Sequence, residues 1–314
     1  MERTVTYSPA YTLVPTYECF NRCTYCNFRR DPGADEWMSL ATARDVLERL
    51  QAEEVIEILI LSGEVHPHSP RRAAWFQHIY HLCELALELG FLPHTNVGPL
   101  SYAEMEKLRE VNVSMGLMVE QVTPKLLETV HAHAPSKRPD LRLQQLDFAG
   151  ELKIPFTTGL LLGLGETTQD WADSLSAIAQ AHHKWHHIQE VILQPHQPGH
   201  SQAETRPACQ GPTLLQAIHL ARKILPADIT LQIPPNLVLQ DLALLDCLRA
   251  GARDLGGIGP IDEVNPHYDH RHRNALIELL QTQGWTLRRR LPVYEKYDAW
   301  LPNKLKTAVK KWRG

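Results

Sequence analysis

Two patterns of apolar and polar positions alternate along most of the chain. Short apolar runs such as EILILS and LLLG have the length and composition of strands. The segments between them repeat apolar residues at helical spacing. Strands are expected at 12–15, 56–62, 92–96, 112–118, 154–162, 190–194, 230–233 and 252–255, and helices at 40–51, 71–89, 102–110, 141–151, 168–185, 212–224 and 239–249.

This alternation predicts an α/β fold with a parallel sheet. Several expected strands are almost continuously apolar, as in strands that are covered on both faces. Eight strands that alternate with helices fit a closed (β/α)8 TIM-like barrel, which takes about 250 residues; a doubly wound open sheet is the alternative. We expect one domain, with the barrel at 1–283 and a basic C-terminal tail at 284–314 that packs on the barrel or extends from it.

Composition narrows the function classes. The 314 residues are 43% hydrophobic and 22% charged, which is an ordinary globular balance. The net charge of -4 gives no general attraction to nucleic acid. No apolar run is long enough to span a membrane, and the polar N-terminus does not look like a secretory signal. We therefore expect a cytoplasmic protein with reduced thiols, and neither a nucleic-acid nor a membrane partner.

The stretch YECFNRCTYCNF places Cys19, Cys23 and Cys26 within eight residues. Iron–sulfur cubanes are normally held by four thiolates, so three would leave one iron open to another ligand. A zinc site completed by a histidine is the alternative. The other cysteines are isolated from one another along the chain: Cys83, Cys209 and Cys247.

Polar residues collect where the expected strands end. Glu64 and His66 follow the second strand, Asn96 ends the third, Glu120 follows the fourth, and Gln194 and His196 follow the sixth. Barrel enzymes carry their chemistry at the carboxyl ends of the strands. Turn formation alone would explain glycine and proline there, but it explains these side chains less well.

The CxxxCxYC motif after a first strand resembles that of the radical S-adenosylmethionine (SAM) enzymes. The resemblance implies a barrel of the radical SAM type and a [4Fe-4S] cluster on Cys19, Cys23 and Cys26, with SAM on the fourth iron. It also implies an electron donor such as flavodoxin or ferredoxin, and a SAM-derived radical that removes hydrogen from a substrate. The SAM contacts that it implies are Tyr25, Ser62, Gly63, Glu64, Asn96, Glu120, Arg142, Gly163 and Glu166.

A narrower resemblance covers residues from about 4 to about 269. Stretches such as LILSGEVHPHSPRR, GFLPHTNVGPLS and ARDLGGIGPIDEVNP are similar to the stand-alone ring-closing subunit of 7,8-didemethyl-8-hydroxy-5-deazariboflavin (FO) synthase. The resemblance implies a small-molecule substrate, 5-amino-5-(4-hydroxybenzyl)-6-(D-ribitylimino)-5,6-dihydrouracil, which a second radical SAM subunit makes. The chain would remove hydrogen from this adduct and close a ring with loss of ammonia.

Ring closure needs proton transfers, for which His66, Gln194, His196 and Glu263 are candidates. Two other functions remain open. One is another radical SAM reaction on the same barrel, for example a biotin-synthase-like one, which would need a second cluster from the poorly spaced remaining cysteines. The other is a non-catalytic binding protein stabilised by a metal.

Overall fold

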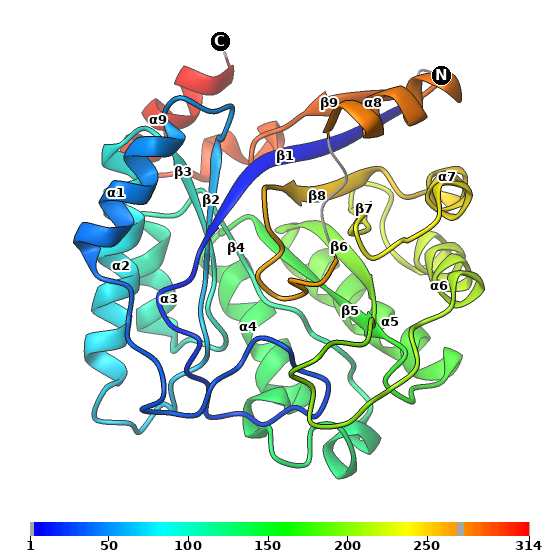
Figure 1. Ribbon diagram of the computed structural model, residues 1–314, viewed down its shortest axis with the longest axis horizontal. Coiled ribbons are helices and arrows are strands. Elements are labelled where there is room, and N and C mark those ends of the chain that lie inside the picture. The colour runs from blue at the N-terminus through cyan, green and yellow to red at the C-terminus, as the bar shows by residue number, and fades with distance from the viewer. Residues whose placement is uncertain (1–2, 269–272, 314) are drawn as a thin grey trace.

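The computed structural model describes residues 3–268 and 273–313. The ends of the expected ranges at 1, 269 and 314 lie outside these described residues. Within them, parallel strands and helices alternate, as Figure 1 shows. The strands are β1 (Thr4–Leu13), β2 (Glu57–Leu61), β3 (Leu92–Asn96), β4 (Ser114–Gly116), β5 (Phe156–Leu162), β6 (Ile188–Pro195), β7 (Thr230–Gln232), β8 (Asp254–Ile258) and β9 (Thr286–Arg289).

The first eight strands close into a barrel. They follow one another in order from β2 to β8, and β1 completes the ring between β8 and β2. Ala10 of β1 pairs with Glu57 of β2, and Thr6 of β1 pairs with Asp254 of β8, both in parallel. The predicted (β/α)8 barrel is thus confirmed, and the open-sheet alternative is excluded because an open sheet would leave two free edges.

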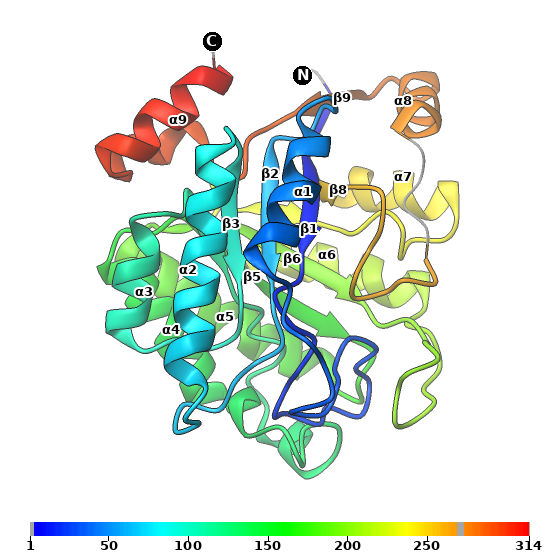
Figure 2. The ribbon, with the colours of Figure 1, turned by 60° about the vertical axis from the view of Figure 1, so that its left-hand side comes forward.

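Helices cover the outside of the barrel (Figures 1 and 2). Two have a capping box at their start: Ser101 with Glu104, and Thr167 with Asp170. The helices are α1 (Leu40–Leu50), α2 (Arg72–Glu88), α3 (Tyr102–Arg109), α4 (Pro139–Glu151), α5 (Thr168–Trp185), α6 (Gly211–Ile224), α7 (Asp241–Ala250), α8 (Arg273–Thr282) and α9 (Asn303–Arg313), with short 3-10 helices at Pro124–Glu128, Pro135–Lys137 and Glu295–Trp300.

The C-terminal segment is tied to the barrel by its backbone. Strand β9 pairs with the beginning of β1, from Thr4 with Thr286 to Tyr7 with Arg289. Helix α9 buries Leu305 and Val309 in a cluster with residues at the amino ends of the barrel strands, such as Ile56 and Leu92. This segment therefore covers the end of the barrel opposite the cysteine loop, as Figure 2 shows for α9.

Candidate active site

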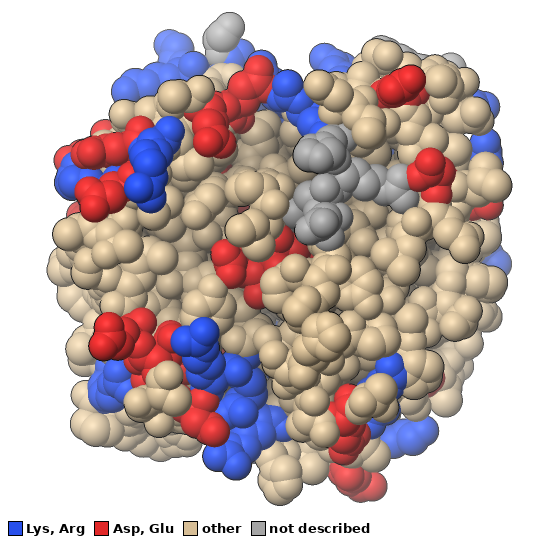
Figure 3. Space-filling model, in the orientation of Figure 1, with Lys and Arg blue, Asp and Glu red and all other residues tan. Residues whose placement is uncertain are grey.

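The loop between β1 and α1 carries the three cysteines and is held by one buried carboxylate. Glu18 accepts hydrogen bonds from the backbone N–H of Gly33 at 2.8 Å, from Trp37 Nε1 at 3.3 Å and from Arg71 Nη1 at 2.6 Å. The backbone of Glu18 also forms an isolated β-bridge with that of Arg30 across the loop. These contacts fix the loop in one shape against α2. Figure 3 shows basic and acidic side chains intermingled over this loop.

Cys19, Cys23 and Cys26 line one cavity at the carboxyl end of the barrel, hereafter the thiol cavity. Cys23 is buried and the other two are half-buried. Burial raises the pKa of the Cys19 thiol to about 11 and that of Cys23 to about 12. Metal ligation requires thiolates, which burial disfavours. A cationic centre would have to offset the free-energy cost of ionising these thiols, as bound metals do.

Facing the thiols, the Glu64 carboxylate sits in a network of donors. Arg142 Nη2 donates to Glu64 Oε1 at 3.0 Å. Asn21 Nδ2 donates to Oε2 at 2.9 Å, and the Ser136 hydroxyl also donates to Oε2. Arg142 is itself buried, and it also donates to the carbonyls of Ser136 and Met118. Glu64 is therefore oriented before any ligand arrives.

A second carboxylate, Glu120, lies on the same wall. It adopts a left-handed backbone conformation, with φ at 65°, which is uncommon for a residue other than glycine. Lys137 Nζ donates to Glu120 Oε1 at 2.5 Å. Burial opposes ionisation of Glu120, but Lys137 and Arg142 together hold its pKa below the usual value. The strained backbone thus turns an ionised carboxylate into the cavity.

Two glycines make room for this arrangement. A Cβ on Gly63 would stand 2.1 Å from the Glu18 carbonyl oxygen, so any side chain there would displace the cysteine loop. A Cβ on Gly98 would stand 2.4 Å from Glu64 Cγ, and the φ of Gly98 is +83°. Ser62 makes structural contacts: its hydroxyl accepts from Trp75 Nε1 at 3.0 Å and donates to the Gly63 carbonyl.

The structure brings most of the SAM contacts expected from the sequence to the thiol cavity. Its lining includes the expected residues Tyr25, Ser62, Gly63, Glu64, Asn96, Glu120 and Arg142. Gly163 and Glu166 line neither this cavity nor the barrel lumen. The Glu166 carboxylate accepts from the N–H groups of Gly163 and Leu164 and from Trp171 Nε1, so it caps its own turn.

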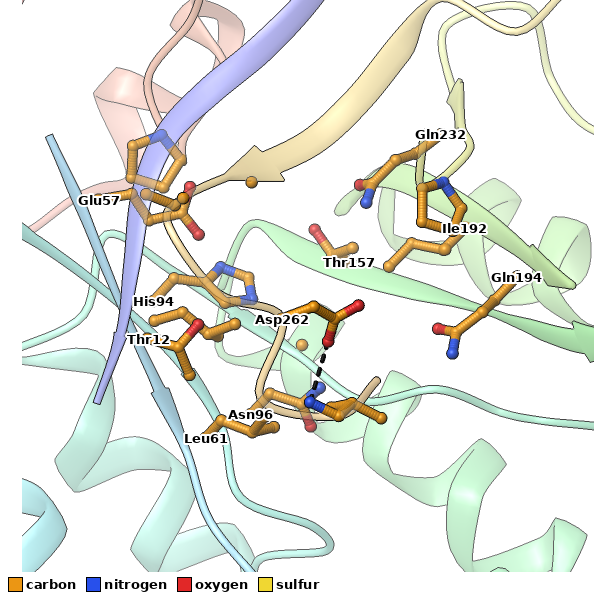
Figure 4. Close-up of a pocket in the computed structure, with 18 of the residues that line it drawn as sticks. Thr12, Glu57, Leu61, His94, Asn96, Thr157, Ile192, Gln194, Gln232 and Asp262 are labelled. Atoms are coloured by element: carbon orange, nitrogen blue, oxygen red, sulfur yellow. Dashed lines mark hydrogen bonds between the residues drawn. The ribbon is translucent and has the colours of Figure 1, made fainter. Parts of the chain in front are cut away.

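A second cavity of about 200 Å³ occupies the barrel lumen. It continues from the thiol cavity, because Leu61, Asn96, Leu117, Met118, Gln194 and Val264 line both. Figure 4 shows polar side chains from several strands facing this lumen. At its mouth, Asp262 accepts from Asn236 Nδ2 at 2.8 Å. A molecule in the lumen would thus reach the thiol cavity without crossing solvent.

Two of the four candidates for proton transfer face the lumen. Gln194 lines both cavities, and Glu263 lines the lumen while accepting from the Tyr17 hydroxyl at 2.7 Å. His66 is exposed and stacks edge-on against Phe20 outside both cavities. His196 is buried beside Pro207 and Gln202 and lines neither cavity.

Several residues at the site were not foreseen. In the thiol cavity they are Asn21 and Lys137, with Ser136 behind them; in the lumen they include His94, Glu57, Glu190 and Arg290. The available signal was a polar residue inside an apolar strand, as in EILIL and in QEVILQP. The position of Arg290 had no such signal, since it follows a strand that the sequence analysis did not predict.

The metal-stabilised alternative gains no support from the geometry. In residues 3–268 and 273–313, no three His, Cys, Asp or Glu side chains converge on a point that would hold a single metal ion. A cubane instead spaces its thiolates apart, one for each iron. Cys83 and Cys247 are buried residues of α2 and α7, and neither lines the thiol cavity. Among the described helices, none has the length and apolar character to cross a membrane.

Comparisons with known proteins identify the family. The family model "Radical SAM superfamily" matches residues 13–178. The chain is 66% identical over 308 residues to the FO synthase of Trichormus variabilis, covering 98% of this chain and 91% of that protein. It is 61% identical over 309 residues to the FO synthase of Thermosynechococcus vestitus, covering 98% of both.

Solved structures support the fold. The hydrogenase maturase HydG from Carboxydothermus hydrogenoformans superposes with a TM-score of 0.76 at 16% identity, covering 98% of this chain and 76% of HydG. Methylornithine synthase superposes with a TM-score of 0.71 at 16% identity, covering 95% and 87%. Membership of the radical SAM family implies a [4Fe-4S] cluster and SAM. From these matches, the chain belongs to the radical SAM superfamily and, within it, to the family of 7,8-didemethyl-8-hydroxy-5-deazariboflavin synthases.

Proposed function

We propose that this chain is the ring-closing FO synthase subunit. It acts on the 5-amino-5-(4-hydroxybenzyl)-6-(D-ribitylimino)-5,6-dihydrouracil adduct and forms FO with release of ammonia. The observation that carries this proposal is the continuity of a cavity lined by three thiols with a polar barrel lumen. High identity to proteins named FO synthase over nearly the whole chain supports the choice of reaction.

Cys19, Cys23 and Cys26 would hold the cluster. All three residues line the thiol cavity, and no fourth cysteine is among the described residues that line it. Such a donor set fits a cubane that keeps one iron for SAM. The cluster and SAM together supply the one-electron chemistry that removes hydrogen from the substrate. The chain's own residues bind, orient and exclude water.

Glu64 and Glu120 are the proposed contacts to SAM. An ionised carboxylate is a strong acceptor for the amino group of SAM, and Arg142, Asn21 and Ser136 already hold Glu64 in place. Glu120 would accept from the ribose hydroxyls, with Lys137 keeping it ionised. Tyr25, which lines the same wall, hydrogen-bonds through its hydroxyl to His131 Nε2 at 3.0 Å.

The substrate would bind in the lumen with its reacting rings at the mouth. Gln194, which lines both cavities, would contact both ligands. Glu263 is the candidate for proton transfer at the mouth; it accepts from Tyr17, which leaves its other oxygen for the substrate. His66 and His196 would need to move before they could contact a molecule in either cavity.

The proposal includes two protein partners in the cytoplasm. One is a second radical SAM subunit that makes the adduct, because the chain has a single local cysteine triad and so a single centre of this type. The other is an electron donor such as flavodoxin or ferredoxin, since the one-electron chemistry needs a reductant.

Anaerobic reconstitution tests the function. The iron- and sulfide-loaded chain, given SAM, reductant and preformed adduct, should yield fluorescent FO, ammonia and 5′-deoxyadenosine. Given only tyrosine and 5-amino-6-(D-ribitylamino)uracil, it should yield no FO until the second subunit is added. FO made by the lone chain from these two precursors would refute the split-synthase proposal.

The same assay tests the competing functions. SAM cleavage without FO, even with the adduct present, would favour another radical SAM reaction such as a biotin-synthase-like one. A colourless protein that holds one zinc ion after reconstitution would instead favour the metal-stabilised binding protein.

A further inference from the structure

The floor of the barrel lumen is unusually polar for this fold. TIM barrels normally fill the interior with branched apolar side chains. Here the lining of the deep end of the lumen cavity includes six polar residues from different elements: Glu57, His94, Thr157, Glu190, Gln232 and Arg290. Figure 4 shows Glu57, His94, Thr157 and Gln232 arranged around this space. We call these six residues the lumen floor.

Small residues leave the floor open rather than packed. Ala10, Gly116 and Gly257 line the cavity where larger side chains would fill it. A Cβ on Gly116 would stand 2.9 Å from His94 Nε2, so the imidazole occupies space that a side chain there would take. A Cβ on Gly257 would stand 3.0 Å from the Cβ of Ala10. The cavity therefore extends down to the polar floor.

Together with Asp254, a buried carboxylate outside the cavity lining, the lumen floor has three carboxylates and one arginine. Arg290 donates through Nε and Nη2 to Asp254 at 2.7 and 2.8 Å, and its Nη2 lies 2.6 Å from Glu190 Oε1. Glu190 also accepts from the hydroxyls of Tyr294 at 2.7 Å and Thr157 at 3.2 Å. Within the described residues, no cation stands at ion-pair distance from the third carboxylate, Glu57. Burial raises the pKa of Glu57 and that of Glu190, the latter to about 7.

His94 adds a group that can both donate and accept. Its Nδ1 is hydrogen-bonded to the Ser114 hydroxyl at 2.7 Å, which leaves Nε2 on the side of Gly116 and the cavity. Burial lowers the pKa of His94 to about 3, so the ring is neutral at physiological pH. A neutral ring whose outer nitrogen faces the lumen suits an uncharged hydroxyl group.

We propose that the lumen floor is the subsite for the polyhydroxylated chain of the substrate, with the reacting rings toward the thiol cavity. This inference rests on the proposed function, which supplies a ribityl chain. Hydroxyl groups can donate to the Glu57 carboxylate, which has no cation at ion-pair distance among the described residues, and can accept from Arg290 and Gln232. An anionic group would be repelled by the surplus of acids, and an apolar group would leave buried acceptors unpaired. The rings must lie at the other end, because hydrogen is removed beside the cluster.

A titration of the reconstituted chain tests the subsite. The probes are FO itself and the same deazaflavin ring system without its ribityl chain, each followed by its fluorescence. FO should bind the wild-type chain at least tenfold more tightly than the ring alone. In Glu57→Leu the dissociation constant for FO should rise about ten- to hundredfold, while that of the bare ring stays within about twofold. Glu53→Leu, at an exposed glutamate outside the lumen, is the matched control and should change neither value.

The outcomes separate the subsite from the function. Equal affinity of the wild-type chain for FO and for the bare ring would overturn the subsite, even if the chain makes FO from the adduct. If Glu57→Leu weakened the binding of both probes equally, the subsite would be overturned as well, since the effect would then not be specific to the ribityl group. Failure to make FO would count against the proposed function itself. The comparison of the two probes on the wild-type protein needs no variant, so the proposal can still be refuted if the Glu57→Leu protein misfolds.

Discussion

At the scale of single residues, the contrast between Glu64 and Glu166 is the sharpest. Both follow a barrel strand, and both resemble SAM contacts of the family. Glu64 lines the thiol cavity, whereas the Glu166 carboxylate accepts hydrogen bonds from Gly163 N–H, Leu164 N–H and Trp171 Nε1. We expect Glu64→Gln to weaken SAM binding about ten- to hundredfold. A neutral amide cannot neutralise the positive charges of the buried Arg142 and of the incoming ammonium group. Calorimetric titration of SAM into the reconstituted variant measures this.

Glu166→Gln is the matched variant with the opposite expected result. It removes charge-assisted hydrogen bonds to Gly163, Leu164 and Trp171, at a cost of about 1–3 kcal/mol in the free energy of unfolding. Its SAM affinity should stay within about twofold of wild type. Denaturant unfolding and the same SAM titration check both values. A tenfold loss of SAM affinity would instead return Glu166 to the cofactor contacts that the sequence suggested.

The cysteines give a second prediction at this scale. Replacing Cys19, Cys23 or Cys26 with Ala should abolish cluster retention and SAM cleavage. Cys209→Ala should leave both largely intact, since Cys209 lies beside Gly163 and His196 and outside the thiol cavity. Iron content and the yield of 5′-deoxyadenosine decide it. If Cys209 proved as essential as the triad, a cluster with four thiolates would follow and SAM would have no open iron.

The sequence was most informative where local spacing or a motif determines the contact. The cysteine triad and the stretch from Ser62 to Glu64 are short, and in the structure both line the thiol cavity. Lys137 and Ser136 were missed, because their 3-10 helix reaches the cavity only through tertiary packing. Glu166 illustrates the opposite limit: its sequence context cannot tell whether the carboxylate faces a ligand or caps its own turn.

At the scale of elements, the hydrophobic periodicity predicted helices α1 to α7 well, but it predicted neither α8 nor the C-terminal strand β9. The start of β1 alternates polar Thr4, Thr6 and Ser8 with buried Val5 and Tyr7, so the strand begins eight residues before the expected start at 12. Strand β9 is short and carries arginines, and only its pairing with β1 makes it a strand. Such pairing between distant segments leaves little trace in a local pattern.

Arg290, which directly follows β9, gives the prediction at this scale. Arg290→Leu would leave Asp254 and Glu190 buried without their cation, so the free energy of unfolding should fall by about 3–5 kcal/mol. Arg289→Leu is the matched control, because Arg289 is exposed, and it should change the value by no more than about 0.5 kcal/mol. Denaturant unfolding of both variants measures this. Equal, small effects would mean that β9 does not position Arg290 as a partner of these acids.

At the scale of the whole molecule, the lumen joins two ends with different chemistry. One end carries the thiols and oriented carboxylates, and the other carries the acids that share Arg290. The closed barrel holds both ends in continuous cavities, while the C-terminal segment packs against the amino ends of β2, β3 and β4. The first end could be predicted from the sequence because it lies on loops that carry motifs. The second end could not, because it is assembled from single polar residues on separate strands.

The buried acids also make stability depend on pH. Burial raises the pKa of Glu190 to about 7, against roughly 4.3 in an unfolded chain, although Arg290 opposes the rise. The folded state therefore holds a proton that the unfolded state has released, so the contribution of Glu190 to stability is present below pH 4 and is lost as the pH rises toward 7. His94 acts in the opposite direction below about pH 6.5, because burial lowers its pKa to about 3. A comparison of wild type with Glu190→Gln tests this, because both proteins contain His94 and its contribution cancels. Between pH 5 and pH 8 the free energy of unfolding of the wild-type chain should fall by ~2 kcal/mol relative to that of the variant. Denaturant unfolding at both pH values measures this difference. Parallel curves for the two proteins would show that Glu190 stays ionised throughout, with Arg290 outweighing the cost of burial.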